Sequence, residues 1–425
     1  MTRRQRFYLE TYGCSANRSD SEIISGILSK IGLTNAKNPE SADIIIINTC
    51  FVKQSTESKI LRRIAELHNK FPDKNLIITG CMPDAISGKI KKTAPKATLI
   101  STNQIKMIGF AAESLAKGLR LDLLGSSKTE KICLPKMRKN NLTDIIQICS
   151  GCLGSCSYCG TKIAKGGLQS YPPEKIALAV RSAYYSGCRE FWLTGQDIGC
   201  YGFDIDSNLP ELLSKILDVE GKYFVRLGMM NPNNVEKIIG PLLEVCGDDR
   251  IMKFFHIPVQ SGSDSVLSDM KRGYTSRDFK KIVLKIRKKI PLCTIGTDII
   301  VGYPTETVID FEKTLELLRK TKPDWTNVSK FTKRDGTLAQ NLKPLDSAIV
   351  KTRSEIASKL AKEIQIEQTK KWINWSGEVL VTQEGIGKNF AHREIILDKN
   401  DNVGEFVNVR VERVEGLKIY GDLKI

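Results

Sequence analysis

The stretch that decides the fold is Gly151-Cys152-Leu153-Gly154-Ser155-Cys156-Ser157-Tyr158-Cys159, which closely follows the apolar segment 144–148. Its cysteines are separated by three residues and then by two. A loop with this spacing can wrap three corners of a cubane iron–sulfur cluster and leave the fourth iron without a protein ligand. Because an iron with an open coordination position can bind a substrate or a cofactor, the spacing indicates chemistry rather than simple electron transfer.

Cys149 lies three residues upstream and leaves two other interpretations open. With it, the four cysteines could form an electron-transfer cluster or a crowded zinc site. The central gap is much shorter than the roughly 12 to 20 residues that separate the pairs in ordinary zinc modules. The histidines, His68, His256 and His392, all lie elsewhere in the sequence. A three-cysteine cluster is therefore the preferred interpretation.

The composition is that of an ordinary globular protein, with 41% hydrophobic and 27% charged residues. A length of 425 residues predicts about two to four domains. No apolar run approaches the roughly 18 residues needed to span a bilayer, and the first residues do not resemble a signal peptide. We therefore expect a cytoplasmic protein with no membrane partner. In that reducing compartment the twelve cysteines are better explained as metal ligands and buried thiols than as disulfides.

The formal net charge is +17, and it is concentrated near the N-terminus. Residues 1–140 hold 24 Lys and Arg against 12 Asp and Glu. A basic surface attracts phosphate backbones by releasing counterions, so we expect a nucleic-acid partner. A basic protein that binds no nucleic acid is the alternative.

The first part of the chain alternates apolar strands with amphipathic helices, which is typical of an α/β domain with a parallel sheet. We expect strands at 7–11, 43–48 and 76–79, and helices near 21–31 and 56–69. A cysteine follows each strand: Cys14, Cys50 and Cys81. Parallel strands end at one edge of their sheet, so these cysteines are brought together near helix N-termini, which favour thiolates. Each alone suggests a small buried residue, but three at equivalent positions predict a second three-cysteine cluster with an open iron.

A polar, Lys-rich run at 126–141 predicts a linker. Beyond it, strand-like and helix-like segments alternate about six times. We expect strands at 144–148, 190–193, 223–228, 252–257, 294–301 and 325–331. This pattern predicts an open (β/α)6 barrel, a partial relative of the eight-stranded kind, with its active site at the carboxyl ends of the strands.

Those strand ends are polar and could bind a polar cofactor. The candidate cofactor-binding residues are Tyr158 in the cysteine loop and Gln196, Asp197, Gln260, Ser261 and Asp298 at the strand ends. For any one of them, a satisfied loop or capping role is the alternative.

A helical connector at about 347–372 leads to a tail of short β-branched segments. These lie at 377–383, 393–397, 406–413 and 418–425. They predict a small all-β barrel of the sort often attached to RNA enzymes. Residues 373–425 hold 7 Lys and Arg against 9 Asp and Glu, so any grip on RNA there depends on local basic residues or on shape.

Together the two cysteine sets, the strand end at 193–195, the run 256–264 and the terminal β module resemble the radical S-adenosylmethionine methylthiotransferases. The runs 193–202 and 226–234 are most similar to the archaeal and eukaryotic branch, which modifies N6-threonylcarbamoyladenosine at position 37 of tRNA. The resemblance implies the following domains: an N-terminal methylthiotransferase domain at 1–125, a linker at 126–141, a radical-SAM barrel at 142–345, a helical connector at 346–372 and a TRAM-like β-barrel at 373–425.

The resemblance also implies roles for the cysteines. Cys152, Cys156 and Cys159 would hold a [4Fe–4S] cluster whose open iron chelates S-adenosyl-L-methionine, which one electron cleaves to a 5′-deoxyadenosyl radical. Cys14, Cys50 and Cys81 would hold an auxiliary [4Fe–4S] cluster whose open iron binds the sulfur to be transferred. A radical is needed because the hydrogen on adenine C2 is not acidic. The implied partners are tRNA, a flavodoxin- or ferredoxin-like reducing electron donor and a sulfur source.

Two rival functions remain. The same chemistry could act on isopentenyl-adenosine in tRNA or on an aspartate of a ribosomal protein, or the chain could be a non-catalytic iron–sulfur protein that binds RNA. A prenylated base would need an apolar pocket and a threonyl carboxylate a basic one.

The chain departs from the family pattern at two places. Ala164-Lys165-Gly166 stands where Ala-Arg-Gly is usual, and Arg334-Asp335-Gly336 stands where Arg-Pro-Gly is usual. Neither change affects an expected iron ligand, so we expect altered local contacts to substrate or cofactor rather than lost activity. The cysteines without an expected role are Cys133, Cys149, Cys188, Cys200, Cys246 and Cys293.

Overall fold

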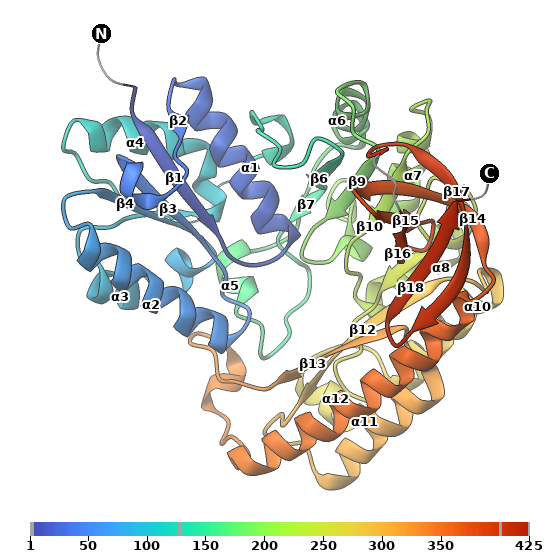
Figure 1. Ribbon diagram of the computed structural model, residues 1–425. Helices are drawn as coiled ribbons and strands as arrows, with labels where there is room; N and C mark the ends of the chain where they lie inside the picture. The colour runs from blue at the N-terminus through green and yellow to red at the C-terminus, as the bar shows by residue number, and fades with distance from the viewer. Residues whose placement is uncertain (1–3, 126, 128, 399–401, 424–425) are drawn as a thin grey trace. The chain divides into compact units, whose positions relative to one another are not determined.

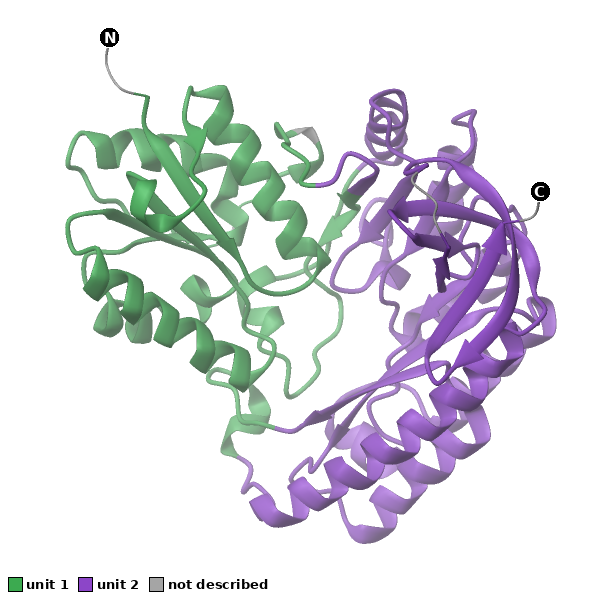
Figure 2. Ribbon diagram, in the orientation of Figure 1, with its two compact units in different colours: residues 1–139, 145–171, 332–341 green, residues 140–144, 172–331, 342–425 purple. Residues whose placement is uncertain are grey.

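The computed structural model describes residues 4–125, 127, 129–398 and 402–423. The chain forms two compact units (Figure 2): residues 1–139, 145–171 and 332–341 make the first, and residues 140–144, 172–331 and 342–425 make the second. The cysteine loop is thus grouped with the N-terminal residues, and most of the later strands with the C-terminal tail. These units follow packing rather than sequence segments, so the expected domain boundaries stay a prediction. None of the described helices is long and apolar enough to cross a membrane.

The first unit contains a parallel sheet with the strand order β2-β1-β3-β4-β5. Its strands are β1 (Arg6–Thr11), β2 (Thr34–Asn35), β3 (Ile44–Thr49), β4 (Asn75–Gly80) and β5 (Thr98–Ser101). Its helices are α1 (Ser15–Lys30), α2 (Gln54–Lys70), α3 (Met82–Thr93) and α4 (Ile108–Ala116), with the 3-10 helices η1 (Pro39–Ser41), η2 (Thr102–Met107) and η3 (Lys131–Cys133). The cysteine loop adds β7 (Cys149–Ser150), α5 (Thr161–Lys165) and β8 (Gln169–Ser170).

The isoleucine run of β3 shows why this sheet is covered on both faces. Ile44 and Ile46 pack in a core with residues of α1 and α4, whereas Ile45 and Ile47 pack in a second core with residues of α2 and α3. Figure 1 shows these two helix pairs on opposite faces of the sheet. All four side chains are at most 1% exposed, and each such burial contributes about 1.5–3 kcal/mol.

Helix α1 differs from the expectation that it begins near residue 21. It begins at Ser15, with Cys14 as its N-cap residue. Its first two turns are polar but buried, so hydrophobic periodicity does not reveal them; the buried polar residues there are Asn17, Ser19, Asp20, Ser21 and Glu22. This buried polar segment adjoins the candidate site described below.

The strands of the predicted barrel are present, in the orders β10-β9-β6 and β11-β12-β13. One parallel bridge joins Val225 of β10 to Ile251, before β11, and another joins Met229, after β10, to His256 of β11. The strands are β6 (Thr143–Gln147), β9 (Glu190–Thr194), β10 (Phe224–Leu227), β11 (Phe254–His256), β12 (Thr294–Val301) and β13 (Trp325–Lys330). The intervening helices are α6 (Pro173–Tyr185), η4 (Ile198–Cys200), α7 (Leu209–Leu217), α8 (Pro232–Val245), α9 (Asp264–Asp269), α10 (Ser276–Lys289) and α11 (Val308–Thr321). The order confirms the predicted open barrel.

The tail forms the predicted small β-barrel. It is closed, with the order β14-β15-β16-β18-β17. Its strands are β14 (Ser376–Gln383), β15 (Ile386–Asn389), β16 (Glu394–Leu397), β17 (Phe406–Glu415) and β18 (Lys418–Leu423). Before it come η5 (Leu338–Asn341), α12 (Ser347–Thr369) and η6 (Lys370–Trp372). Strand β15 was not expected, and the last two residues of the expected final strand, 424–425, lie outside the described residues.

The small barrel packs on the strands of the second unit through one apolar core. Leu142, Phe224, Met252 and Phe254 contribute from the strand barrel, and Leu380 of β14 contributes from the tail. A buried carboxylate reinforces this contact, because Glu190 of β9 lies 3.3 Å from the Lys388 ammonium of β15. Burying a charge is costly unless it is paired, so Lys388 of the small barrel offsets the cost of burying this carboxylate.

Candidate active site

The three single cysteines lie at one edge of the N-terminal sheet, as predicted. Cys14 follows β1, Cys50 follows β3 and Cys81 follows β4, and these strands are parallel neighbours. A Cβ atom added at Gly13 would lie 2.9 Å from the Cβ of Cys50, so the chain beside Cys14 closely approaches Cys50. The parallel pairing therefore brings the three thiols together.

Backbone geometry holds these cysteines at the strand ends. Gly80, with a φ of +95°, precedes Cys81, and a side chain at Gly80 would overlap the Thr49 carbonyl. The Cys81 amide donates to Thr49 O at 3.0 Å, and Asn17 Nδ2 donates to the same oxygen at 2.7 Å. The Cys14 thiol in turn lies 3.4 Å from Asn17 Oδ1. Asn17 thus links the first turn of α1 to the end of β3.

Burial favours the neutral form of the metal-free thiols of Cys50 and Cys81, against the thiolate that helix N-termini were expected to favour. Burial raises the pKa of Cys81 to about 12, and burial also raises the pKa of Cys50. Cys14 adds to both effects, since a neighbouring negative thiolate disfavours a second one. Metal binding by Cys50 and Cys81 must therefore release protons.

The second set of cysteines lies on a loop closed at its base by a short antiparallel pair. Cys149 pairs with Ser170, and Ser150 pairs with Gln169. Gly151 has a φ of +73°, and a side chain there would overlap the Gly167 carbonyl, so the loop can begin only with glycine. Within the loop Cys152, Cys156 and Cys159 are half-buried.

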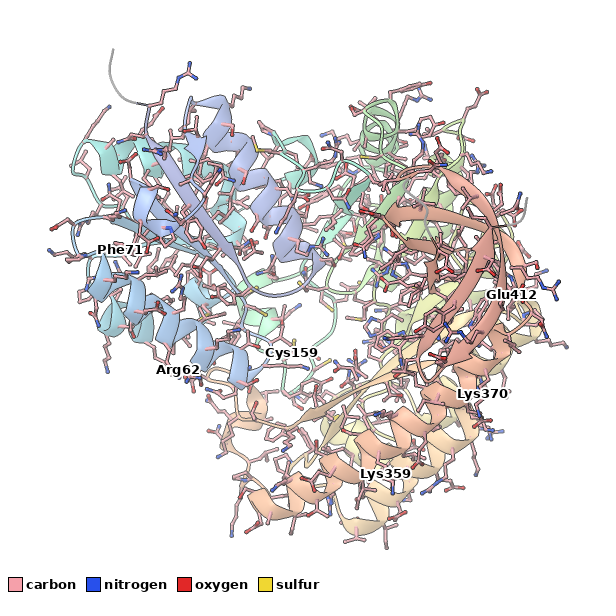
Figure 3. All side chains as sticks on the ribbon, in the orientation of Figure 1. Arg62, Phe71, Cys159, Lys359, Lys370 and Glu412 are labelled. Atoms are coloured by element: carbon pink, nitrogen blue, oxygen red, sulfur yellow. The ribbon has the colours of Figure 1, made fainter. Side chains whose placement is uncertain are left out.

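The sulfur atoms of Cys152 and Cys156 flank the small residue between them. The Gly154 amide donates to Cys152 Sγ at 3.2 Å, and a Cβ atom at Gly154 would lie 3.3 Å and 3.8 Å from the two sulfurs, Cys152 Sγ and Cys156 Sγ respectively. Cys159, labelled in Figure 3, is separated from the start of α5 by Gly160 alone, and its backbone amide donates to Cys156 O at 3.2 Å. Burial raises the pKa of the Cys159 thiol despite hydrogen bonds from nearby amides.

Cys149 differs from the other loop cysteines in its surroundings. It is fully buried in β7 and lies near enough to Tyr171 to affect the pKa of that phenol. The pKa of Cys159, in contrast, is affected by Cys156 and Cys152. This placement favours the interpretation of Cys149 as a structural thiol.

Both cysteine sets fit the donor chemistry of a cubane, which takes thiolates at separate irons. Among the described residues, no three His, Cys, Asp or Glu side chains converge closely enough to hold one metal ion. A single-ion site of the zinc type is thus not preformed, whereas a cubane holds its ligands farther apart. The two sets belong to the same unit, and the Phe51 ring next to Cys50 lies 2.7 Å from where a Cβ of Gly160, next to Cys159, would stand.

The predicted cofactor-binding residues have mixed surroundings, and their role toward a cofactor stays a prediction. Asp197 is buried and accepts hydrogen bonds from the amides of Gly199 and Asn231 and from Asn234 Nδ2, at 2.8 to 3.0 Å. Ser261 Oγ accepts from the Ser263 amide at 3.2 Å. Such contacts are typical of the structural alternative, and they do not test a role toward a cofactor.

The other predicted cofactor-binding residues are Gln260 and Asp298, which contact each other, and Gln196 and Tyr158. The Gln260 amide donates to Asp298 O at 2.8 Å, so the structure brings these two residues together. The Asp298 carboxylate lies 2.8 Å from His256 Nε2, a pairing that the sequence did not indicate. Gln196 and Tyr158 are half-buried.

The residues at both departures form polar contacts within the first unit. Lys165 is buried, and its ammonium donates to Thr102 Oγ1 at 2.6 Å. Arg334 forms a buried ion pair with Glu57 at 2.6 Å. Asp335, beside it, is exposed and pairs with Lys89 at 2.7 Å.

The remaining cysteines give no sign of a further metal site. Cys188, Cys200, Cys246 and Cys293 are fully buried, and the side chain of Cys133 lies outside the described residues. None of the cysteines whose side chains are described forms a disulfide.

Comparison with known proteins identifies the family. Residues 6–102 match the model of the uncharacterized protein family UPF0004, and residues 146–318 match the radical SAM superfamily. A probable threonylcarbamoyladenosine tRNA methylthiotransferase of Methanocaldococcus jannaschii is 40% identical over 98% of this chain and 97% of its own length. The chain belongs to the threonylcarbamoyladenosine tRNA methylthiotransferase family. Another such archaeal protein, from Methanothermobacter thermautotrophicus, is 37% identical over 98% of this chain and 99% of its own.

The similarity extends to eukaryotes and to solved structures. The threonylcarbamoyladenosine tRNA methylthiotransferase of Drosophila melanogaster is 35% identical over 99% of this chain and 78% of its own. The radical S-adenosylmethionine methyltransferase TsrM from Kitasatospora setae, with cobalamin and a [4Fe–4S] cluster bound, superposes with a TM-score of 0.60 at 12% identity, covering 80% of this chain and 77% of the other. At that identity the likeness concerns the fold alone.

Family membership confirms several predictions made from the sequence. The chain is a methylthiotransferase of the radical SAM class, and its cofactors are [4Fe–4S] clusters and S-adenosyl-L-methionine. The predicted fold class is also correct. Which residues hold each cofactor stays a prediction.

Proposed function

We propose that this protein attaches a methylthio group to C2 of N6-threonylcarbamoyladenosine at position 37 of tRNA. One observation carries the proposal: relatives from archaea and flies that bear this activity in their names are 35 to 40% identical to nearly the whole chain. The two cysteine trios, one at the strand ends and one in the loop, supply the equipment that such a reaction needs.

The loop trio, Cys152, Cys156 and Cys159, would hold the cluster that binds S-adenosyl-L-methionine. A reduced cluster with bound S-adenosyl-L-methionine would supply a 5′-deoxyadenosyl radical. Such a radical can remove a hydrogen atom from a carbon that is too weakly acidic for any side-chain base to deprotonate. The strand-end trio, Cys14, Cys50 and Cys81, would hold the auxiliary cluster that presents sulfur. Cys50 and Cys81 are buried and Cys14 is exposed, so the trio has one side that solvent and substrate can reach.

The proposed division of the chain follows the same roles. Residues 1–125 form the methylthiotransferase domain, 126–141 a linker, 142–345 the radical-SAM barrel, 346–372 the connector and 373–425 the TRAM-like barrel. The reaction takes place in the cytoplasm with tRNA as substrate. Electrons come from a flavodoxin- or ferredoxin-like donor, and sulfur comes from a separate source.

Mass spectrometry of tRNA nucleosides from a deletion strain tests the substrate. We expect the methylthiolated form of threonylcarbamoyladenosine to disappear and to return with the wild-type gene. Cys50→Ala and Cys156→Ala should fail to restore it, whereas Cys246→Ala should restore it, because Cys246 is a buried thiol of the second unit.

The other outcomes identify the rivals. An unchanged level of the modified nucleoside overturns the proposal. Loss of methylthiolated isopentenyl-adenosine, or of a methylthiolated aspartate in a ribosomal protein, would assign the chemistry to that substrate instead. A strain in which all three persist would leave a non-catalytic iron–sulfur protein.

A further inference from the structure

A group of buried polar side chains lies beside the strand-end cysteines, and none of its members is an expected iron ligand. Its centre is Asp20 on α1, whose side chain is 2% exposed. Asp20 Oδ1 accepts from Lys131 Nζ at 2.7 Å and from Gln147 Nε2 at 2.8 Å. Asp20 Oδ2 accepts from Thr102 Oγ1 at 2.9 Å. The carboxylate thus accepts hydrogen bonds from three donors on three different segments.

Lys165 enters this group from α5 with a side chain that is only 1% exposed. Its ammonium donates to Thr102 Oγ1 at 2.6 Å and lies 3.4 Å from Asp20 Oδ2. Lys131 lies within 3.1 Å of the same hydroxyl oxygen. Two buried ammonium groups therefore share one carboxylate. An unbalanced buried charge is costly, so an additional anion nearby would stabilise the arrangement.

The location of Lys165 indicates where that anion belongs. Gly80 pairs with Ser101 across β4 and β5, so the next residues, Cys81 and Thr102, lie at the same edge of the sheet. Ala164, adjacent to Lys165, packs in the same apolar core as Cys50 and Cys81. The ammonium of Lys165 is thus held by Thr102 beside the strand-end trio.

The electrostatics of the cysteines agree with this position. Burial lowers the pKa of Lys165, but Asp20, Cys81 and Cys14 more than offset it and hold the pKa above its ordinary value. The Lys165 ammonium is therefore close enough to Cys81 and Cys14 to interact with them electrostatically.

We propose that Lys165 is a positioning residue that supplies buried positive charge to the auxiliary cluster held by Cys14, Cys50 and Cys81, and thereby raises its reduction potential. The inference depends on the proposed function only in requiring that cluster. A cluster with thiolate ligands is anionic, and net charge near it sets its potential. A cation in a site of low dielectric favours uptake of an electron, and groups behind the ligands tune metals in this way. Asp20 partly cancels that charge.

Lys165 and Asp20 carry opposite charges, so removing each charge should shift the reduction potential in opposite directions. The background is the full chain with Cys152, Cys156 and Cys159 replaced by Ala, so that one cluster remains to report. Its midpoint potential is measured by anaerobic redox titration followed by electron paramagnetic resonance. Lys165→Met should shift the potential to more negative values, by at least tenfold in the reduction equilibrium, or about 59 mV for a one-electron couple. Asp20→Asn should shift it to more positive values.

Two further variants serve as controls. Lys165→Arg keeps the charge and should leave the potential nearly unchanged. Lys131→Met removes the same charge from the other side of Asp20, and it should shift the potential less, because Cys81 has only a minor effect on the pKa of Lys131.

The results separate three outcomes. If Lys165→Met and Asp20→Asn move the potential in the same direction, or leave it unmoved, Lys165 has only a structural role and the inference is overturned. If Lys165→Met does not fold, the sign of the Asp20→Asn shift decides alone. If the chain with Cys152, Cys156 and Cys159 replaced by Ala binds no iron, the proposed function is contradicted, because it requires the auxiliary cluster. If that chain binds about four irons but the substitutions leave the potential unchanged, only this inference is contradicted.

Discussion

At the scale of single residues, Cys149 decides between the two interpretations of the cysteine loop. It is buried in β7, whereas Cys156 is half-buried within the loop. Cys149→Ala should therefore retain about eight irons per chain, counted as two cubanes, and should still form 5′-deoxyadenosine. Cys156→Ala should lose about four irons and form none. Anaerobic reconstitution, iron analysis and chromatography of the cleavage product measure these quantities.

Cys50→Ala is the matched variant for the strand-end trio. It should also lose about four irons but should still cleave S-adenosyl-L-methionine, because Cys50 belongs to the sulfur-presenting site. Equal loss of cleavage in Cys50→Ala and Cys156→Ala would contradict this division of labour. If Cys149→Ala also loses iron, the four-cysteine interpretation is correct.

The residues of the site differ in how visible they are in the sequence. The cysteine sites are visible in the sequence, because a thiol after each of three strands, or three thiols within one loop, indicates a metal site. Asp20 and Lys165 are 145 residues apart, and only the fold places them together. The sequence offered two partial signals, the departure from the family pattern at Lys165 and the polar segment after Cys14, and neither relates one residue to the other.

At the scale of elements, His392 probes the contact between the small barrel and the strand barrel. It lies just after β15, with its ring edge-on to Phe254 at 5.0 Å between ring centroids. Burial, then Arg226, Lys388 and Arg393, lower the pKa of His392 well below its ordinary value, although Glu190 lies 3.6 Å from Nδ1. The native protein thus keeps this imidazole neutral.

This neutrality predicts a loss of stability in acid. Below about pH 6.5 the unfolded chain takes up a proton at residue 392 that the folded chain does not, so the free energy of unfolding falls as the pH decreases, by up to about 1.4 kcal/mol per pH unit. His392→Asn should remove this dependence, and Asn tolerates the φ of +58° at this position. The measurement is thermal unfolding of the metal-free wild type and variant at about pH 7.5 and about pH 5.5. It compares the stability of each protein above and below the ordinary histidine pKa. An equal acid-induced loss in both proteins would contradict the prediction.

Elements were predictable where burial produces a regular pattern. For β3 and β12, the strand ends predicted from the apolar runs agree with the observed ends to within one residue. Strand β15 was missed because Gly387, Lys388 and Asn389 are typical of turns. It forms because β14 and β16 both pair with it, and Gly387 is required where a Cβ would lie 2.7 Å from Val379 Cγ2. Such partners are remote in sequence, so local propensity does not reveal them.

At the scale of the whole molecule, the uneven charge predicts where the phosphate backbone of tRNA binds. Residues 1–140 account for most of the net charge of +17, whereas residues 373–425 hold more acidic than basic groups. Neutralising a phosphate releases counterions, so it makes affinity depend on salt. The salt dependence of binding should therefore respond to basic residues of the N-terminal segment more than to those of the long connector helix.

Two exposed pairs with the same helical spacing allow a matched comparison. Lys59 and Arg62 lie on α2, and Lys359 and Lys362 lie on α12; Figure 3 labels Arg62 and Lys359. Replacing the α2 pair by Gln should reduce the slope of log affinity against log salt by about 0.7 to 0.9 for each phosphate that the variant no longer neutralises. The same change on α12 should leave the slope unaltered. Fluorescence anisotropy of labelled tRNA, titrated at several salt concentrations, measures both slopes. An equal or larger effect of the α12 pair would place the phosphate-binding surface on the connector helix, and the concentration of charge near the N-terminus would then serve something other than tRNA.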